Sequence, residues 1–429
     1  MKSNIRKIAT RATAIFGMVF LMGLSLFGGA QSVKVTAQEN IPATVDTYNP
    51  IGTVINLFDY WVDSADANDN NDVADHINKG INKDHILTFM KSGDVLNGDR
   101  ERNIDANKYT GANGGPRYNI VENWLGDDGY PVLRQGSNGI SRAESLDYLF
   151  DATNFEGKKA YINAKDLLKV DGDGYYTYNS KENFAAFDED TNSFSIYEKA
   201  AVKNGNDIYP VGGNVGQFFP FNSAQEVFDG DVTSTDERLN HYFGVTVTSR
   251  FSQPTKGYVN GEAMTYEFAG DDDVWIFIDD VLIADLGGIH SAVSTKIDFS
   301  TGNVYISNTE SVADNASATT TLYNQYREAY IEKYGQTEAN ARLDKMFVQK
   351  GRNYVYSDDS VHTIKFFYLE RGNGASNMNL KFNLKSVPEN SIVKVDEMGN
   401  AISGVRFRLY QADENYNFNE DRDLISFGT

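Results

Sequence analysis

The stretch GDDDVWIFIDD, Gly270 to Asp280, decides how the second half of this chain folds. Three consecutive carboxylates, Asp271, Asp272 and Asp273, stand directly before Val, Trp, Ile, Phe and Ile, a run of residues that favours a strand. A cluster of like charges at the end of a buried strand is costly unless a cation, backbone N–H groups or water compensates it. Whether a cation, backbone N–H groups or water compensates these charges therefore helps to decide the function of the protein.

Strand patterns with turn residues between them continue on both sides of this stretch. Strands are predicted at residues 53–62, 241–251 and 264–270, and hairpins are predicted to turn at 279–280, 301–303 and 372–374. The 25 Tyr and 26 Phe residues suit a core in which aromatic rings fill the space between two sheets. We therefore expect residues 51–386 to form a mostly β domain, a large antiparallel, jelly-roll-like β-sandwich.

One segment departs from the strand pattern. Leu322, Tyr326 and Tyr330 recur every four residues within 321–347, with charged residues between them. This spacing predicts a single inserted amphipathic helix, interrupted at Gly335, that packs across the sandwich.

The N-terminus has the features of a secretory signal peptide. Basic residues precede an apolar run at 14–30, and no acidic residue occurs before Glu39. Small residues favour cleavage after Ala30 or Ala37, and retention of the apolar run as an anchor is the alternative. The polar residues 38–50 are expected to form a linker. We therefore expect a secreted or cell-surface protein.

Charge and cysteine content narrow the class of protein. The chain has no cysteine, so a secreted form must be stabilised by core burial, metal or another covalent link. The net charge is −21 and becomes −26 without residues 1–37, which hold five basic residues and no acid. Such a surface argues against nucleic acid and anionic membranes as partners, and it suits divalent cations, neutral glycans or basic partner surfaces.

Two separated segments carry a resemblance to a known family. GDDDVWIFIDDVLIADLGGIH, followed by HTIKFFYLERGNGASNMNLKFNL, closely resembles the fibro-slime domain of bacterial surface proteins, a relative of the protective-antigen-type β-sandwich. The resemblance covers about residues 240–386. Asp273 and Asp280 depart from it, because glycine is usual at both positions.

The resemblance implies a calcium site. In lectin members of the superfamily an Asp-Asp pair holds calcium, which in turn holds sugar hydroxyls, so Asp271 and Asp272 are the implied metal ligands. Ca²⁺ takes six to eight oxygen ligands, so more are needed. We expect Asp273, Asn373 or Asn377 to contribute. The alternative is that these aspartates accept backbone N–H bonds in a turn and the sandwich is only a spacer.

The C-terminal segment 390–429 resembles the start of a SpaA-like, or collagen-adhesin B-type, domain of Gram-positive surface proteins. The stretch IVKVDEMGNAISGVRFRLY carries this resemblance and implies a small Ig-like or prealbumin-like β domain. Lys394 then matches the lysine that forms an intramolecular isopeptide bond in that family. Its partner would lie beyond Thr429, so we expect the chain to be part of a longer protein attached to a cell wall through its C-terminal region.

Other candidate chemistry is weaker. The acidic stretches that begin at Asp66 and Asp171 lack parts of the EF-hand pattern. No nucleophile motif or zinc motif occurs, and structural roles are expected for His241 and His290. We therefore expect a non-catalytic adhesin-type module that binds a glycan or a host surface with calcium. The alternatives are a structural matrix protein and a secreted carbohydrate-active enzyme.

Overall fold

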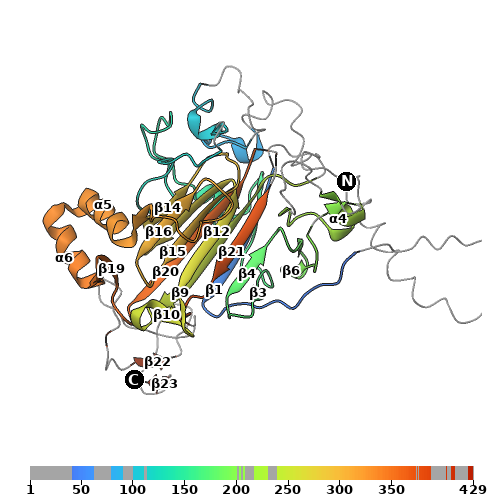
Figure 1. The fold of residues 1–429 in the computed structure, drawn as a ribbon. Helices are drawn as coiled ribbons and strands as arrows, with labels where there is room; N and C mark the ends of the chain where they lie inside the picture. Colours follow the sequence, from blue (N-terminus) through green and yellow to red (C-terminus); the bar gives the residue numbers. More distant parts are fainter. Residues whose placement is uncertain are drawn as a thin grey trace, which may run out of the picture. The chain divides into compact units, whose positions relative to one another are not determined.

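The computed structural model confirms a mostly β protein with two large antiparallel sheets. It describes residues 41–61, 79–89, 100–110, 114–200, 202–203, 206–207, 217–229, 239–372, 374, 376–387, 402, 407–410 and 424–428. Figure 1 shows the two sheets stacked, with helices at one side. The predicted signal peptide lies outside the described residues. No helix among the described residues is both long and apolar enough to span a bilayer.

The first sheet has six strands, and all its neighbouring strands are antiparallel. In spatial order they are β14 (Val281–Leu286), β13 (Asp273–Ile278), β20 (Val361–Glu370), β9 (Phe243–Ser252), β1 (Thr53–Tyr60) and β2 (Lys158–Tyr161).

The second sheet has seven strands and is also antiparallel throughout. Its order is β17 (Thr320–Thr321), β16 (Asn303–Ser307), β15 (Val293–Asp298), β12 (Thr265–Asp271), β21 (Asn377–Phe382), β4 (Tyr176–Asn179) and β3 (Lys169–Val170).

Short elements complete the described part of the chain. The two-stranded pairs are β5 (Ala185–Asp188) with β6 (Ser193–Ile196), β7 (Val202–Lys203) with β8 (Asn206–Asp207), β10 (Tyr258–Val259) with β11 (Glu262–Ala263), β18 (Phe347–Lys350) with β19 (Asn353–Tyr356), and β22 (Phe407–Tyr410) with β23 (Leu424–Gly428). The helices are α3 (Asp147–Phe150), α4 (Ala224–Asp229), α5 (Leu322–Tyr334) and α6 (Gln336–Met346), and the 3-10 turns are Gly80–Asn82, Asp105–Asn107 and Thr255–Gly257.

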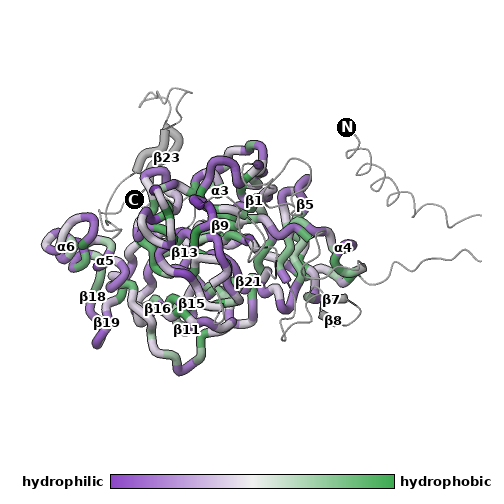
Figure 2. The backbone as a smooth tube through the Cα atoms, turned by 90° about the horizontal axis from the view of Figure 1, so that it is seen from above, coloured by the Kyte–Doolittle hydropathy of each residue, from purple (hydrophilic) through white to green (hydrophobic). Residues whose placement is uncertain are grey.

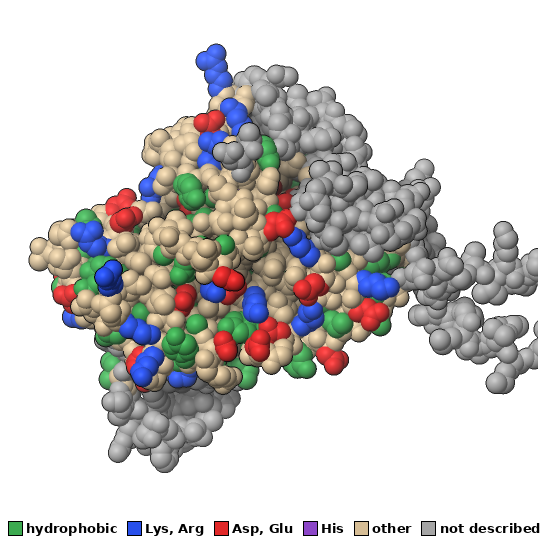
Figure 3. All heavy atoms as spheres, viewed as in Figure 1, with side chains coloured by type: hydrophobic (Ala, Val, Ile, Leu, Met, Phe, Trp, Pro, Cys, Tyr) green, Lys and Arg blue, Asp and Glu red, His purple; other side chains and the backbone are tan. Residues whose placement is uncertain are grey.

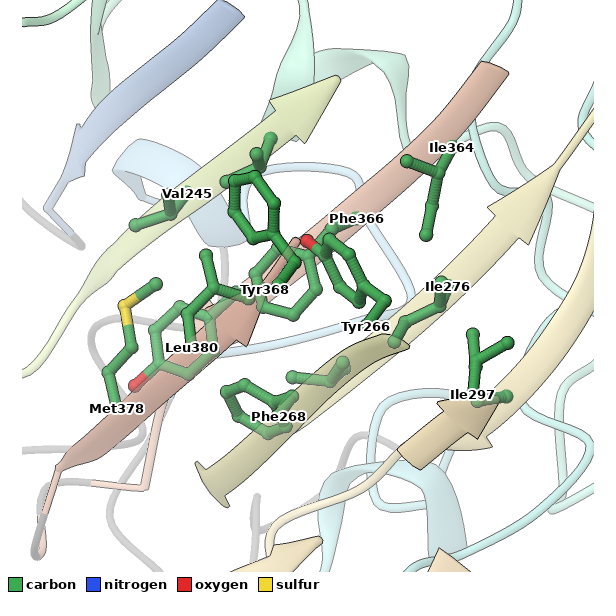
Figure 4. Close-up of a cluster of buried hydrophobic side chains, with 14 of the residues drawn as sticks. Val245, Tyr266, Phe268, Ile276, Ile297, Ile364, Phe366, Tyr368, Met378 and Leu380 are labelled. Atoms are coloured by element: carbon green, nitrogen blue, oxygen red, sulfur yellow. The ribbon is translucent and has the colours of Figure 1, made fainter. Parts of the chain in front are cut away.

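The main core lies between the two sheets. Figure 4 shows the inward residues Val245, Ile276, Phe366 and Tyr368 of the first sheet facing Phe268 and Leu380 of the second. Full burial of one such aliphatic or aromatic side chain stabilises the fold by about 1.5–3 kcal/mol. Figure 2 shows the hydrophobic positions concentrated in these central strands, whereas α6 is mainly hydrophilic.

A second core covers the other face of the six-stranded sheet. Trp275, Phe277 and Phe367 point away from the sandwich and pack with residues from segments 79–89, 104–106 and 120–150. Strand β13 is therefore buried on both faces, which explains why its sequence is continuously apolar and does not alternate. These segments form a third layer on the sandwich, which the alternation of apolar and polar residues along the strands did not predict.

The edge of the six-stranded sheet at β14 is occupied by other parts of the chain. Val281 forms an isolated bridge with Trp124, and Leu282 N donates to Asn123 O at 3.0 Å. The Gln325 side chain of α5 lies 3.3 Å from Ile283 O. Main-chain groups in the first half of this edge are thus paired within the chain.

The predicted helix is confirmed with its interruption. Thr321 caps α5, since its side chain accepts a hydrogen bond from Asn324 N, and Gly335 separates α5 from α6 with a φ of 78°. Such a positive φ favours glycine. Helix α5 packs against β14 and β19, so the helical hairpin lies at one side of the sandwich (Figure 1).

Two of the three predicted hairpins are confirmed and the third is wrong. The chain turns at Asp279-Asp280 between β13 and β14, and at residues 299–302 between β15 and β16. Strands β20 and β21, however, do not pair with each other, because they belong to different sheets. The glycines at 372 and 374 mark a crossing between sheets; a turn signal does not say which sheet the next strand joins.

Residues 43–48, expected to lie in a linker, run along the sandwich. Val45 N donates to Ile196 O at 2.8 Å, and Tyr48 N donates to Leu168 O at 2.7 Å.

Of the predicted C-terminal domain, only Ile402 and the paired strands β22 and β23 are described, and Lys394 lies outside the described residues.

The backbones of β12 and β21 approach so closely at residue 270 that only glycine fits there. A Cβ there would lie 2.1 Å from Asn377 O on β21. We expect Gly270→Ala to lower the free energy of unfolding by about 3 kcal/mol, measured by denaturant unfolding. Gly172→Ala is the control, since nothing lies within 4 Å of its Cβ position. Equal stability of the two variants would contradict this packing.

Candidate functional site

Two crossings between the sheets meet at one end of the sandwich. Strand β12 ends at Asp271 in one sheet, and β13 begins at Asp273 in the other. Strand β20 ends at Glu370, and β21 begins at Asn377 in the opposite sheet. Asp271 is paired in register with Asn377, so the two crossings are neighbours. This topology brings the acidic stretch of the sequence beside the glycine-rich one.

Asp273 and Arg371 form a fully buried ion pair between the crossings. Arg371 Nε donates to Asp273 Oδ2 at 2.5 Å and Nη2 donates to Oδ1 at 3.0 Å, a bidentate geometry. Gly288 N also donates to Asp273 at 2.5 Å. The guanidinium reaches the third layer as well, through Ala106 O at 2.7 Å and Asn107 Oδ1 at 3.1 Å. Asp273, one of the expected additional ligands, is thus held by donors from the protein.

Asp271 and Asp272 border a small hollow and are joined by a cis peptide bond. Asp271 accepts hydrogen bonds from Asn377 N at 2.5 Å and from Asn377 Nδ2 at 3.3 Å. Asp272 Oδ1 accepts one from His290 N at 3.0 Å, while its Oδ2 has no hydrogen bond to a described residue. The hollow has a volume of about 210 Å³ and is lined by Tyr109, Asp271, Asp272, Ile289, His290, Ser291, Ala292, Arg371, Gly372 and Gly374.

Glu370 adds a buried carboxylate that the sequence analysis missed. Its Oε2 lies 3.1 Å from the Tyr368 hydroxyl, and its buried Oε1 has no hydrogen-bond partner. The signal was present in the sequence, because Phe366, Tyr368 and Glu370 alternate on the inward face of one strand. A carboxylate on that face is unusual.

The charge cluster changes the acidity of these groups. Burial raises the pKa of Asp271 to about 7, although the hydrogen bonds from Asn377 act in the other direction. Burial and the neighbouring charges of Asp271 and Asp273 raise the pKa of Asp272 well above its usual range, against the attraction of Arg371. Burial, Asp272 and Asp271 likewise raise the pKa of Glu370. Near neutral pH the cluster therefore favours uptake of protons or a cation.

The described residues can be compared with the oxygen shell that a calcium ion requires. They contain no group of three or more His, Cys, Asp or Glu side chains arranged to hold a metal ion. Two carboxylates line the hollow, however, and Asn377 lies beside Asp271, to which it donates hydrogen bonds. The oxygens of Asp271 and Asp272 are of the kind that a hard cation prefers, and such a cation would need further oxygens from backbone, water or ligand. Asn373 lies outside the described residues.

The other residues considered as candidate ligands contact neighbouring parts of the fold, where the structure describes them. The imidazole nitrogens of His290 lie 2.9 Å from Ser291 O and Leu286 O, and His241 packs edge to face on Phe219. Asp171 Oδ1 accepts hydrogen bonds from Asp173 N and Tyr175 N and so stabilises the turn that precedes β4. The acidic stretch from Asp66 lies outside the described residues.

A Ser-His-Asp chain is also present and was not predicted. His362 lies 2.6 Å from both Ser360 Oγ and Asp279 Oδ2. Ser360 is fully buried, and its hydroxyl donates to Ser357 O at 2.7 Å. The serine is therefore enclosed, and this chain of hydrogen bonds holds the β13–β14 turn against the start of β20.

Comparison with known proteins gives partial similarities. No family model matches the chain, and no solved structure matches it. Several psi proteins of Dictyostelium discoideum are similar to parts of it, among them the following three. Protein psiP is 39% identical over 79 residues, 17% of this chain and 10% of psiP. Protein psiD is 36% identical over 103 residues, 24% and 19% of the two chains.

Protein psiQ is similar over a longer segment, 28% identical over 185 residues, 43% of this chain and 15% of psiQ. The chain spans less than a fifth of the length of these relatives. It is thus a β-rich chain with partial similarity to psi proteins.

The ion pair yields a test of stability. Arg371→Met removes one partner and leaves Asp273 charged and buried, so we expect the free energy of unfolding to fall by about 3–5 kcal/mol. Lys381→Met removes the half-exposed pair with Asp171 and should cost about 1 kcal/mol or less. Denaturant unfolding compares the two. Similar small losses would show that the buried pair does not hold the crossings together.

The acidic cluster yields a test of pH dependence. Between the unfolded pKa of Asp271 near 4 and its folded pKa of about 7, the folded state keeps a proton that the unfolded state has released. Stability should therefore fall as pH rises through this window, on the order of 4 kcal/mol for this group. In EDTA, thermal unfolding at pH 5 and pH 8 should differ more in the native chain than in Asp271→Asn. Identical pH profiles would refute the shift.

Proposed function

We propose that this chain is a non-catalytic binding module of an exported surface protein, and that it holds Ca²⁺ at Asp271 and Asp272 to recognise a glycan. One observation carries the proposal: two buried carboxylates face a hollow without a paired cation of their own, because Arg371 is bound to Asp273. The resemblance to the fibro-slime domain supports the same ligands.

The residues have distinct roles in this mechanism. Asp272 offers the Oδ2 atom that has no hydrogen bond to a described residue, and Asn377 orients Asp271 through two N–H groups. Bound calcium would offset the repulsion between the carboxylates and present open coordination positions for paired sugar hydroxyls. The Asp273–Arg371 pair keeps the crossings in place. On the face that Figure 3 shows, basic and acidic side chains of the described residues are interspersed.

The wider setting belongs to the same proposal. The N-terminal signal pattern supports export, and the SpaA-like resemblance of 390–429 supports attachment to a Gram-positive cell wall through following domains. Lys394 is then the isopeptide lysine of the first such domain. Similarity to psi proteins neither requires nor opposes this setting.

Calorimetry tests the calcium site. At pH 7.5 we expect Ca²⁺ to bind the native chain and to raise its melting temperature, and Asp271→Asn/Asp272→Asn to lose both effects. Asp358→Asn/Asp359→Asn is the matched control, an adjacent pair on the exposed surface whose loss should leave binding unchanged. If the native chain gives no heat with Ca²⁺, the acidic cluster serves the fold alone, and the structural matrix protein becomes the better description.

A further inference from the structure

A second hollow borders the one at Asp271 and Asp272. It has a volume of about 420 Å³ and is lined by Thr110, Gly115, Pro116, Arg117, Tyr118, Asn138 and Asn308. Every one of these side chains except the glycine and proline is polar or carries a polar group. The lining holds one cation, Arg117, and no carboxylate.

Neighbouring parts of the chain line the two hollows. Tyr109 lines the first and the next residue, Thr110, lines the second. Thr110 N donates to Ile289 O at 2.9 Å and Arg117 N donates to Gly287 O at 2.7 Å, so both flank the segment that follows β14. A ligand that extends beyond the first hollow along this segment reaches Arg117.

The guanidinium of Arg117 has an N–H donor without a hydrogen-bond partner. Its Nε is buried and has no hydrogen-bond partner, and no described carboxylate forms an ion pair with Arg117. The buried hydroxyl of Thr110, which lines the same hollow, also has no partner. Buried polar atoms are nearly always hydrogen-bonded, so the two unpaired ones beside this hollow are exceptions. Arginine is suited to carboxylates, which it can bind through two parallel N–H groups.

We propose that the glycan recognised at this site is a carboxylated, uronate-type sugar, whose carboxylate binds Arg117 while its hydroxyls bind the cation at Asp271 and Asp272. This inference rests on the proposed function. An anionic sugar would be repelled by the acidic cluster alone. Calcium at the first hollow and Arg117 at the second supply the positive charge that such a ligand needs on both sides.

Trigalacturonate and its methyl ester test the inference, because they differ in charge and little else. Titrations of the full chain in Ca²⁺ should show tighter binding of the acid by roughly tenfold to a hundredfold, the range for a hydrogen bond to a charged group. Arg117→Gln should lose this preference and still bind the ester. Arg327→Gln is the matched control, because it removes the same charge from an exposed position on α5.

The outcomes separate the inference from the proposed function. Calcium-dependent binding of both sugars with equal affinity, or a preference for the acid that survives in Arg117→Gln, overturns the inference and leaves the calcium site standing. Failure of both sugars to bind the calcium-loaded chain overturns the inference as well. Absence of calcium binding overturns both.

Discussion

The bidentate pair between Asp273 and Arg371 is the interaction on which the candidate site depends. It joins the two places where the chain passes from one sheet to the other, and through Ala106 and Asn107 it also holds the third layer. A buried ion pair adds little net stability compared with apolar residues, but loss of one partner is severe. The ion pair matters here because it fixes the two crossings in one arrangement relative to each other.

The same pair leaves its neighbours without compensation. Arg371 is bound to Asp273, so Asp271, Asp272 and Glu370 remain as buried carboxylates that oppose one another. Such a cluster works against folding at neutral pH. A protein that keeps it in spite of this cost either binds something there or requires the arrangement for another reason, and the adjoining hollow favours binding.

The sequence predicted the sandwich, the interrupted helix and two hairpins because each depends on local spacing: alternation, a four-residue repeat, or turn residues. It placed β21 wrongly, since the partner of a strand is set by packing between distant segments. For the candidate site, pattern and resemblance pointed to Asp271, Asp272 and Asn377, which the structure brings together, while their role as ligands stays a prediction. Glu370 was missed although alternation along its strand indicates an inward position. Arg117 was missed because only the folded chain shows that its Nε has no partner.

The blocked edge at β14 limits how copies of this chain can join. An open edge strand offers a row of unpaired N–H and C=O groups to which another strand can be added. Here the segment around Trp124 and the side chain of Gln325 occupy that row. These contacts hinder strand addition at the Val281–Ile283 part of the edge. Copies of the chain that meet there would have to do so through side chains.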